Sequence, residues 1–215
     1  MDFELNEEQS MLRDLVRSFA QNEIDPVASG LESRREFPRD LLKKLAGLGL
    51  LGMAIPAEYG GIKTDYVSLM IALEEVSRSS PSLAVILSVH CSLFSYAILK
   101  YGQDNLKNAY LPKAAEGEIL GAFSLTEPGS GSDISGLATQ AVRRGDRFIL
   151  NGTKAWVSNG NDAGAFILFA QTEVGSGGKK LSAFLVDRET PGLSISKIEE
   201  KMGLHASITT DLVLE

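Results

Sequence analysis

The sequence predicts an α+β protein in which an N-terminal α-helical bundle precedes a domain of antiparallel strands, arranged as a barrel or sandwich. From Asn6 to Glu116 apolar residues recur with helical spacing, whereas after Gly117 short apolar runs are separated by turn residues. Helices and strands are therefore segregated along the chain, which disfavours an alternating β-α-β fold. We expect two domains, a helical one at residues 1–117 and a β-domain at residues 118–215.

The first helix has clear start and stop signals. Asn6 precedes it with Gln9 in capping-box spacing, and Pro26 is expected to end it. Its apolar face follows the i, i+3, i+4, i+7 pattern, at Leu12, Leu15, Val16 and Phe19. Further helices are expected from Pro38 to Leu48, from Asp65 to Arg78, from Leu83 to Leu99 and from Asn105 to Glu116.

The stretch from Leu83 to Leu99 is the most apolar part of the chain. Polar residues interrupt it, at Ser88, His90, Ser92 and Ser95, and a membrane span needs about 20 mostly apolar residues. We therefore expect a helix buried inside the bundle, and no membrane association. His90 and Cys91 are adjacent and point in different directions, so we predict core packing for them and not a nucleophile–base pair.

Composition disfavours several classes of function. The net charge is −7 and the Lys and Arg residues form no cluster or stripe, so nucleic-acid binding is not predicted. The single cysteine, Cys91, excludes an internal disulfide and a cysteine-rich zinc site. The sequence shows no metal-ligand spacing, no Ser-His-Asp set and no basic leader at its N-terminus.

Strands are expected throughout the second half. They are predicted at Ile119–Thr126, Ala138–Val142, Arg147–Leu150, Lys154–Ser158, Phe166–Gln171, Leu181–Val186, Leu193–Ile198 and Ile208–Glu215. Gly145-Asp146 and Asn151-Gly152 predict hairpin turns, and the Gly-rich segment Val174–Lys179 predicts a flexible surface loop. The last strand reaches Glu215 without a cap or turn, from which we expect a chain truncated within its β-domain.

The loop Thr126–Asp133 follows a strand and combines two glycines with three hydroxyl residues, which exposes main-chain N–H groups to an anion. A flexible hairpin loop is an equally good interpretation. A dinucleotide-binding fingerprint fails, because Ile134 stands where its third glycine belongs and no amphipathic helix follows. A P-loop fails as well, because no Gly-Lys-Ser/Thr occurs in this segment.

Trp156 is the only tryptophan and lies near the end of a predicted strand. Composition alone favours a place in the core, which is the usual fate of a lone tryptophan. The alternative is a flat wall beside a flat ligand, with the hydroxyl of Ser158 available as a donor to a ring nitrogen.

Two long motifs resemble the acyl-CoA dehydrogenase family and occur in the order and at the spacing found in that family. They are Ala122–Asp133 and, after Asn151-Gly152, Trp156–Gly160. The opening Leu5–Gln9 and the connector Gly52–Gly61 are similar to the family too, so the resemblance spans nearly the whole chain. It implies an FAD-dependent enzyme with a C-terminal four-helix domain beyond this chain.

The resemblance also implies contacts residue by residue. The strand along the pyrimidine side of the flavin is matched by Phe123, Ser124, Leu125 and Thr126. The loop near the phosphates and the CoA chain is matched by Gly131 and Ser132. The stretch along the ring is matched by Trp156, Val157 and Ser158. Ser182 is a further candidate for a CoA contact. Phe123 and His205 depart from the family, where many members have Tyr and Arg, so a phenol contact at position 123 is in doubt.

The implied reaction is the α,β-dehydrogenation of an acyl-CoA thioester, with electrons passing to electron-transferring flavoprotein. Bulky Phe94 and Tyr96 on the buried helix predict a short or medium acyl chain. The family's catalytic Glu belongs to the third domain, so we assign no catalytic residue within this chain. The intact protein is expected to be a homotetramer or dimer, cytoplasmic in a bacterium or in the mitochondrial matrix. Acyl-CoA oxidases, flavin monooxygenases of the same fold and a non-catalytic interaction module are the alternatives.

Overall fold

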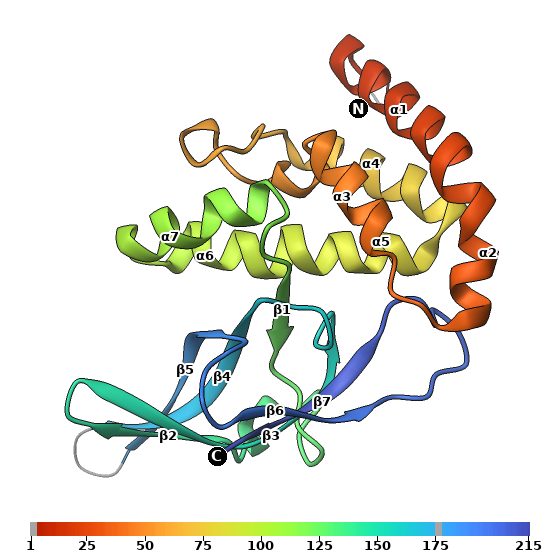
Figure 1. Ribbon diagram of the computed structural model, residues 1–215. Helices are drawn as coiled ribbons and strands as arrows, with labels where there is room; N and C mark the ends of the chain where they lie inside the picture. Colours follow the sequence, from red (N-terminus) through yellow and green to blue (C-terminus); the bar gives the residue numbers. More distant parts are fainter. Residues whose placement is uncertain (1–3, 175–177) are drawn as a thin grey trace. The chain divides into compact units, whose positions relative to one another are not determined.

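The computed structural model describes residues 4–174 and 178–215, which fold into two compact units (Figure 1). The helical unit comprises the residues up to Ile119 and Lys201–Ser207, and the β unit comprises Leu120–Glu200 and Ile208–Glu215. The sequence placed residues 201–207 with the strands, whereas in the structure they belong to the helical unit. There the carboxylate of Glu32 accepts the main-chain N–H of His205 at 2.7 Å.

The helical unit has seven α-helices among its described residues, and side-chain caps mark where α1 and α4 begin. The helices are α1 (Glu7–Phe19), α2 (Asp25–Arg34), α3 (Arg39–Gly47), α4 (Tyr66–Ser79), α5 (Pro81–Ser88), α6 (Tyr96–Tyr101) and α7 (Asp104–Ala115), with 3₁₀ turns at Leu50–Gly52 and Ala57–Tyr59. Asn6 and Gln9 form the predicted capping box of α1. The Asp65 carboxylate caps α4, since it accepts the N–H of Ser68 at 2.8 Å.

Wide π-helical turns occur within two helices, and one of these turns makes the first helix longer than the sequence predicts. Pro26 was expected to end the first helix, but Ala20–Ile24 forms a π turn and the helix continues through α2 to Arg34. The π turn places Pro26 in the first turn of α2, where the helix does not require a main-chain N–H donor. A second π segment, Val89–Ser95, joins α5 to α6.

The helix that runs from Pro81 to Tyr101 matches the expected buried helix. By length and composition it could cross a membrane, yet 61% of its most apolar window is buried. Side chains along it, Leu83, Ile86, Leu87 and Phe94, are 0% exposed. This burial is typical of the core helix of a bundle.

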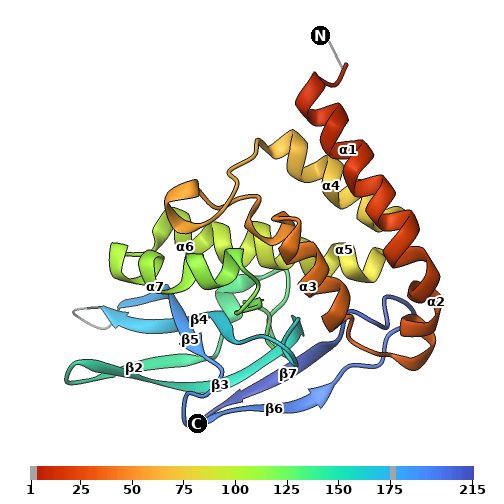
Figure 2. The same ribbon diagram turned by 45° about the horizontal axis from the view of Figure 1, so that its top comes forward.

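The β unit is a curled, mixed sheet. Its strands are β1 (Gly121–Ser124), β2 (Gln140–Arg144), β3 (Arg147–Ser158), β4 (Ala165–Val174), β5 (Gly178–Asp187), β6 (Leu193–Ile198) and β7 (Thr209–Leu214). Their order is β1-β4-β2-β3-β7-β6, and β5 pairs with β4 as well (Figure 2). The α+β class is confirmed, but the sheet is not purely antiparallel. The strand β4 follows the β2–β3 hairpin and lies parallel to both β1 and β2.

The Asn151-Gly152 pair is not the predicted turn, because β3 continues through it. Gly152 has a φ of +154°, and a Cβ there would lie 2.5 Å from Thr139 Oγ1 and 2.8 Å from Thr139 Cα. Glycine therefore serves the close approach of β3 to Thr139. The predicted Gly-rich loop is also shorter than expected, since β4 reaches Val174 and β5 begins at Gly178; the rest of that prediction lies outside the described residues.

Candidate functional site

A tight turn follows β1 and displays its tip to solvent. Glu127 and Ser130 pair across it, with N–H to carbonyl distances of 2.9 Å and 3.0 Å, and Pro128-Gly129 forms the tip. Gly131 follows directly and is exposed. Neither glycine has a positive φ, and a Cβ built on either one would meet nothing within 4 Å. The protein's own packing therefore does not require these glycines, and the main chain here is open to a ligand.

A buried ion pair anchors this turn. The ammonium of Lys154, which is 0% exposed, donates to Glu127 Oε1 at 2.8 Å and to the carbonyl of Leu125 at 3.1 Å. Glu127 also accepts the main-chain N–H of Ala138 at 2.6 Å and of Thr139 at 3.0 Å. Burial by itself would raise the pKa of Glu127, but these hydrogen bonds lower it below its usual value. The carboxylate is therefore ionised and fully engaged.

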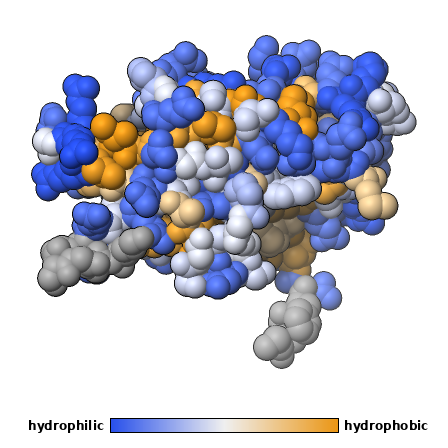
Figure 3. All heavy atoms as spheres, turned by 90° about the horizontal axis from the view of Figure 1, so that it is seen from below, coloured by the Kyte–Doolittle hydropathy of each residue, from blue (hydrophilic) through white to orange (hydrophobic). Residues whose placement is uncertain are grey.

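Trp156 lies beside this turn and not in the core. Its side chain is 55% exposed, whereas the flanking Ala155 and Val157 are 5% and 1% exposed. The N–H of Ala155 donates to the carbonyl of Thr126 at 2.9 Å, which joins the residue before the tryptophan to the start of the turn. Large hydrophobic side chains reach the surface elsewhere as well, as the face in Figure 3 illustrates. Composition favoured a core position for Trp156, and that interpretation is wrong.

The other residues that the sequence singled out on β1 and β3 differ in what they offer a ligand. Phe123 is half-buried and packs against Phe169, with ring centroids 5.1 Å apart. Ser124 is 1% exposed, and its Oγ has no hydrogen-bond partner among the described residues. Val157 belongs to the hydrophobic core of the sheet, so only its main chain is available. Ser158 is half-buried at the end of β3.

Leu125, Thr126 and Ser132 complete the surroundings of the turn. Leu125 and Thr126 are half-buried and use their carbonyls to hold β3, while Ser132 is exposed. Ser182 lies apart from them on β5, opposite Ala170 of β4. Its Oγ lies 2.8 Å from Thr172 Oγ1. The contacts of the described residues do not bring Ser182 to Ser132.

Other reactive side chains of the chain are packed away. His90 is 0% exposed, and burial lowers its pKa to about 4, although the hydrogen bond between its ring and the Ala114 carbonyl raises it in part. Burial raises the pKa of the Cys91 thiol to about 12, so this cysteine is no nucleophile at neutral pH. Within residues 4–174 and 178–215, no three His, Cys, Asp or Glu side chains gather as a metal site.

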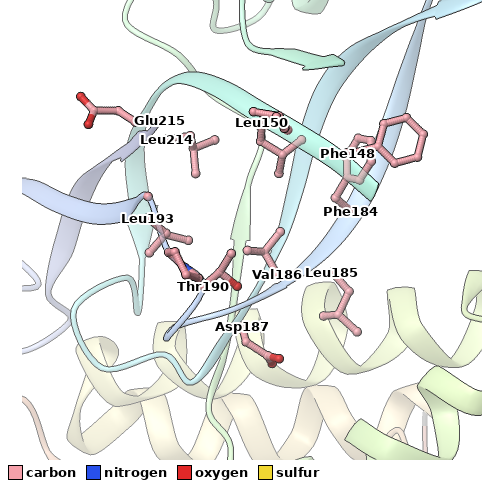
Figure 4. Close-up of a pocket in the computed structure, with 13 residues that line it drawn as sticks. Phe148, Leu150, Phe184, Leu185, Val186, Asp187, Thr190, Leu193, Leu214 and Glu215 are labelled. Atoms are coloured by element: carbon pink, nitrogen blue, oxygen red, sulfur yellow. The ribbon is translucent and has the colours of Figure 1, made fainter. Parts of the chain in front are cut away.

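A cavity of about 470 Å³ occupies a different part of the β unit (Figure 4). Aromatic and aliphatic side chains line it, among them Phe148, Leu150, Phe184, Val186, Leu193 and Leu214. None of the residues that the sequence singled out contributes to it. Polar side chains line it as well, namely Asp187, Thr190 and Glu215.

Sequence reasoning missed the residues that fix the site. Lys154 is the first of these residues. A lysine between strand residues, two positions before a tryptophan, is unusual enough to suggest a buried ion pair. Asp211 was taken as an ordinary strand residue, yet its carboxylate accepts the main-chain N–H of Trp156 at 3.2 Å. A lone aspartate inside a run of β-formers was the available signal.

Family models match both halves of the chain. The model of the acyl-CoA dehydrogenase N-terminal domain matches residues 6–118, and that of the middle domain matches residues 122–215. A short-chain specific acyl-CoA dehydrogenase of Clostridium acetobutylicum is 41% identical over 215 residues, which is all of this chain and 57% of the relative. The chain therefore spans little more than half the length of that curated relative.

Solved structures are similar over the same region. Butyryl-CoA dehydrogenase from Megasphaera elsdenii has a TM-score of 0.94 and 34% identity, covering 100% of this chain and 57% of that one. An acyl-CoA dehydrogenase from Bacillus anthracis, solved in complex with FAD, has a TM-score of 0.90 and 37% identity, covering 99% of this chain and 36% of that one.

Proposed function

The chain belongs to the acyl-CoA dehydrogenase family, and on that basis we propose that its β unit holds FAD for the α,β-dehydrogenation of a short- or medium-chain acyl-CoA thioester. One observation carries this proposal. The N–H of Ala155 donates to the carbonyl of Thr126, which joins the residue before the exposed Trp156 to the residue before the open turn at Glu127–Ser132. This bond supports an anion site and a flat aromatic wall in one region of the β unit.

The residues present fit the two ends of such a cofactor. At the phosphate end, Gly131 and Ser132 are exposed, and a Cβ at Gly131 would enter empty space, which is room that a pyrophosphate or a CoA chain can use. At the ring end, the exposed Trp156 offers a flat apolar surface. The buried Ser124 hydroxyl, which lacks a partner among the described residues, is a further polar group on β1.

In the proposed roles, a flavin held here would supply hydride-accepting chemistry for the β-carbon of the thioester, and the chain's own residues would hold the reactants in place. The main chain and hydroxyl of Thr126 would hold the pyrimidine side, and the Ser158 hydroxyl would donate to the region of N5. Trp156 would cover the ring and exclude water from it. Gly131 and Ser132 would hold the phosphates and the CoA chain.

Removal of the α-proton needs a carboxylate base, and this chain does not supply it in our proposal. Glu127 is the acidic residue of the open turn itself, but Lys154, Ala138 and Thr139 occupy its carboxylate, and its pKa is lowered. A base that is ionised, buried and fully hydrogen-bonded cannot reach a substrate. We therefore assign no catalytic residue here and propose that these 215 residues alone do not turn over acyl-CoA.

Substrate length and partners belong to the same proposal. Phe94 is 0% exposed within the helix that we expect at the end of the acyl pocket, and Tyr96 is half-buried beside it. Bulky side chains there favour short or medium acyl groups, and the Clostridium relative is named short-chain specific. We propose electron-transferring flavoprotein as the electron acceptor and a homotetramer as the intact assembly, in the bacterial cytoplasm or the mitochondrial matrix.

The proposal is tested by incubating the purified chain with FAD and a series of acyl-CoA thioesters. We expect FAD to bind and an artificial electron acceptor to stay oxidised. Steady reduction of the acceptor would overturn the proposal that the catalytic base lies outside this chain. Failure of FAD to bind would overturn the proposed flavin site itself.

A further inference from the structure

We infer that Asp211 is a positioning residue, which fixes a bulge of β3 and thereby presents the Trp156 indole at the cofactor site. This inference rests on the proposed function for its consequence, which is flavin affinity. Its structural part, the control of Trp156 by a side chain on the neighbouring strand β7, stands on the hydrogen bonds and register of the β unit alone.

The register between β3 and β7 shows the bulge. Lys154 lies opposite Leu212, and Val157 lies opposite Thr210. Two residues of β3, Ala155 and Trp156, therefore face a single residue of β7, Asp211. The extra residue pushes Trp156 out of the regular alternation of the strand.

Both main-chain N–H groups in the bulge find acceptors outside the β3–β7 ladder. Ala155 donates to the Thr126 carbonyl at 2.9 Å, and Trp156 donates to Asp211 Oδ1 at 3.2 Å. One of these bonds connects the bulge to the segment after β1, and the other connects it to the strand β7. Since a main-chain N–H without a partner is unfavourable, these acceptors select the bulged conformation.

Trp156 adopts a backbone conformation that a bulky residue avoids. Its φ is +59°, in the left-handed region, where non-glycine residues are strained and persist only when their surroundings hold them. Ala155 and Val157 are buried on either side and fix the flanks. The Asp211 carboxylate is the group that contacts the strained residue itself.

Asp211 also faces a second bulge, on its other side. In the β6–β7 ladder, Ile195 lies opposite Leu212 and Lys197 lies opposite Asp211, so that Ser196 is the extra residue. The ammonium of Lys197 donates to both carboxylate oxygens of Glu199, at 2.9 Å and 2.8 Å. The position of Asp211 between two bulged strands gives its short side chain access to the main chain of β3.

The test uses the single tryptophan of the chain. Emission excited at the long-wavelength edge, where tyrosine does not absorb, and the long-wavelength indole band of the near-ultraviolet circular dichroism report on Trp156. In Asp211→Ala the acceptor is gone, and we expect a weaker near-ultraviolet signal, lower emission polarisation and FAD binding weaker by about fivefold. Asp211→Asn keeps Oδ1 as an acceptor and should restore most of each signal. Asp65→Ala is the matched control, because Asp65 accepts a main-chain N–H in the helical unit and should change stability but not the Trp156 signals.

The outcomes separate the inference from the proposed function. Wild-type Trp156 signals in Asp211→Ala, or equal losses in the Ala and Asn variants, would overturn the positioning role. If the wild-type chain does not bind FAD, the proposed function fails, while the dichroism and polarisation still decide the role of Asp211. If Asp211→Ala does not fold, Asp211→Glu serves instead, since one added methylene displaces the carboxylate and should disturb the same signals.

Discussion

Lys154 and Glu127 form a buried ion pair, with Nζ 2.8 Å from Oε1, that joins β3 to the turn after β1. Their side chains are 0% and 5% exposed. The Glu127 carboxylate also accepts hydrogen bonds from the main-chain N–H groups of Ala138 and Thr139. One charge pair therefore anchors both ends of the loop between β1 and β2. The segment that we expect to meet phosphates is therefore held by a single buried cluster of charge and hydrogen bonds.

Lys154→Met should destabilise the β unit by about 3–5 kcal/mol, because it leaves the Glu127 carboxylate buried without its counter-ion. Urea unfolding followed by circular dichroism measures the loss. The control is Lys43→Met, which breaks the exposed pair with Asp40 and should change stability by about 1 kcal/mol or less. Equal effects of the two variants would contradict the account of the buried pair.

Gly131→Ala should separate ligand binding from folding. A Cβ at Gly131 meets nothing within 4 Å, so the thermal midpoint should stay the same or rise slightly. If the main chain there faces phosphates, the added methyl group should weaken FAD binding by about tenfold or more. Gly152→Ala should behave in the opposite way and destabilise the fold, because its Cβ would lie 2.8 Å from Thr139 Cα. Unchanged FAD affinity in Gly131→Ala would remove this loop from the site.

His90 should make the chain acid-sensitive. Burial lowers its pKa in the folded chain to about 4, from about 6.5 when unfolded. Between these values the unfolded chain binds a proton that the folded chain does not, so stability should fall as the pH drops from about 6.5 towards 4, by about 1.4 kcal/mol per pH unit. His90→Gln should flatten this slope in unfolding experiments across that range. His205→Gln, which removes the other histidine, should keep the slope, and a slope lost there instead would refute the assignment.

The sequence predicted the elements well wherever local chemistry decided the outcome. The capping box at Asn6 and Gln9 and the start of α4 after Asp65 depend on residues within one turn, and the structure has both. The strands of the β unit likewise follow apolar alternation. The limits of the helices were less predictable at Pro26, because a π turn several residues earlier changed the position that the proline occupies.

The architecture of the candidate site depends on contacts between distant residues, which local patterns do not contain. Lys154 and Glu127 are 27 residues apart, and Asp211 and Trp156 are 55 apart. The exposure of Trp156 follows from a bulge whose extra residue is visible only in the strand register. Asn151-Gly152 looked like a turn because its partner in the close approach, Thr139, lies on another segment.

The central claim is that the β unit holds a flavin against Trp156, and titration of the purified chain with FAD tests it most directly. We expect saturable quenching of Trp156 emission, beyond the inner-filter loss that the same FAD concentrations cause for free tryptophan, and a matching change in flavin fluorescence. Emission that falls no further than that of free tryptophan, with the flavin signal of FAD in buffer, would contradict the claim.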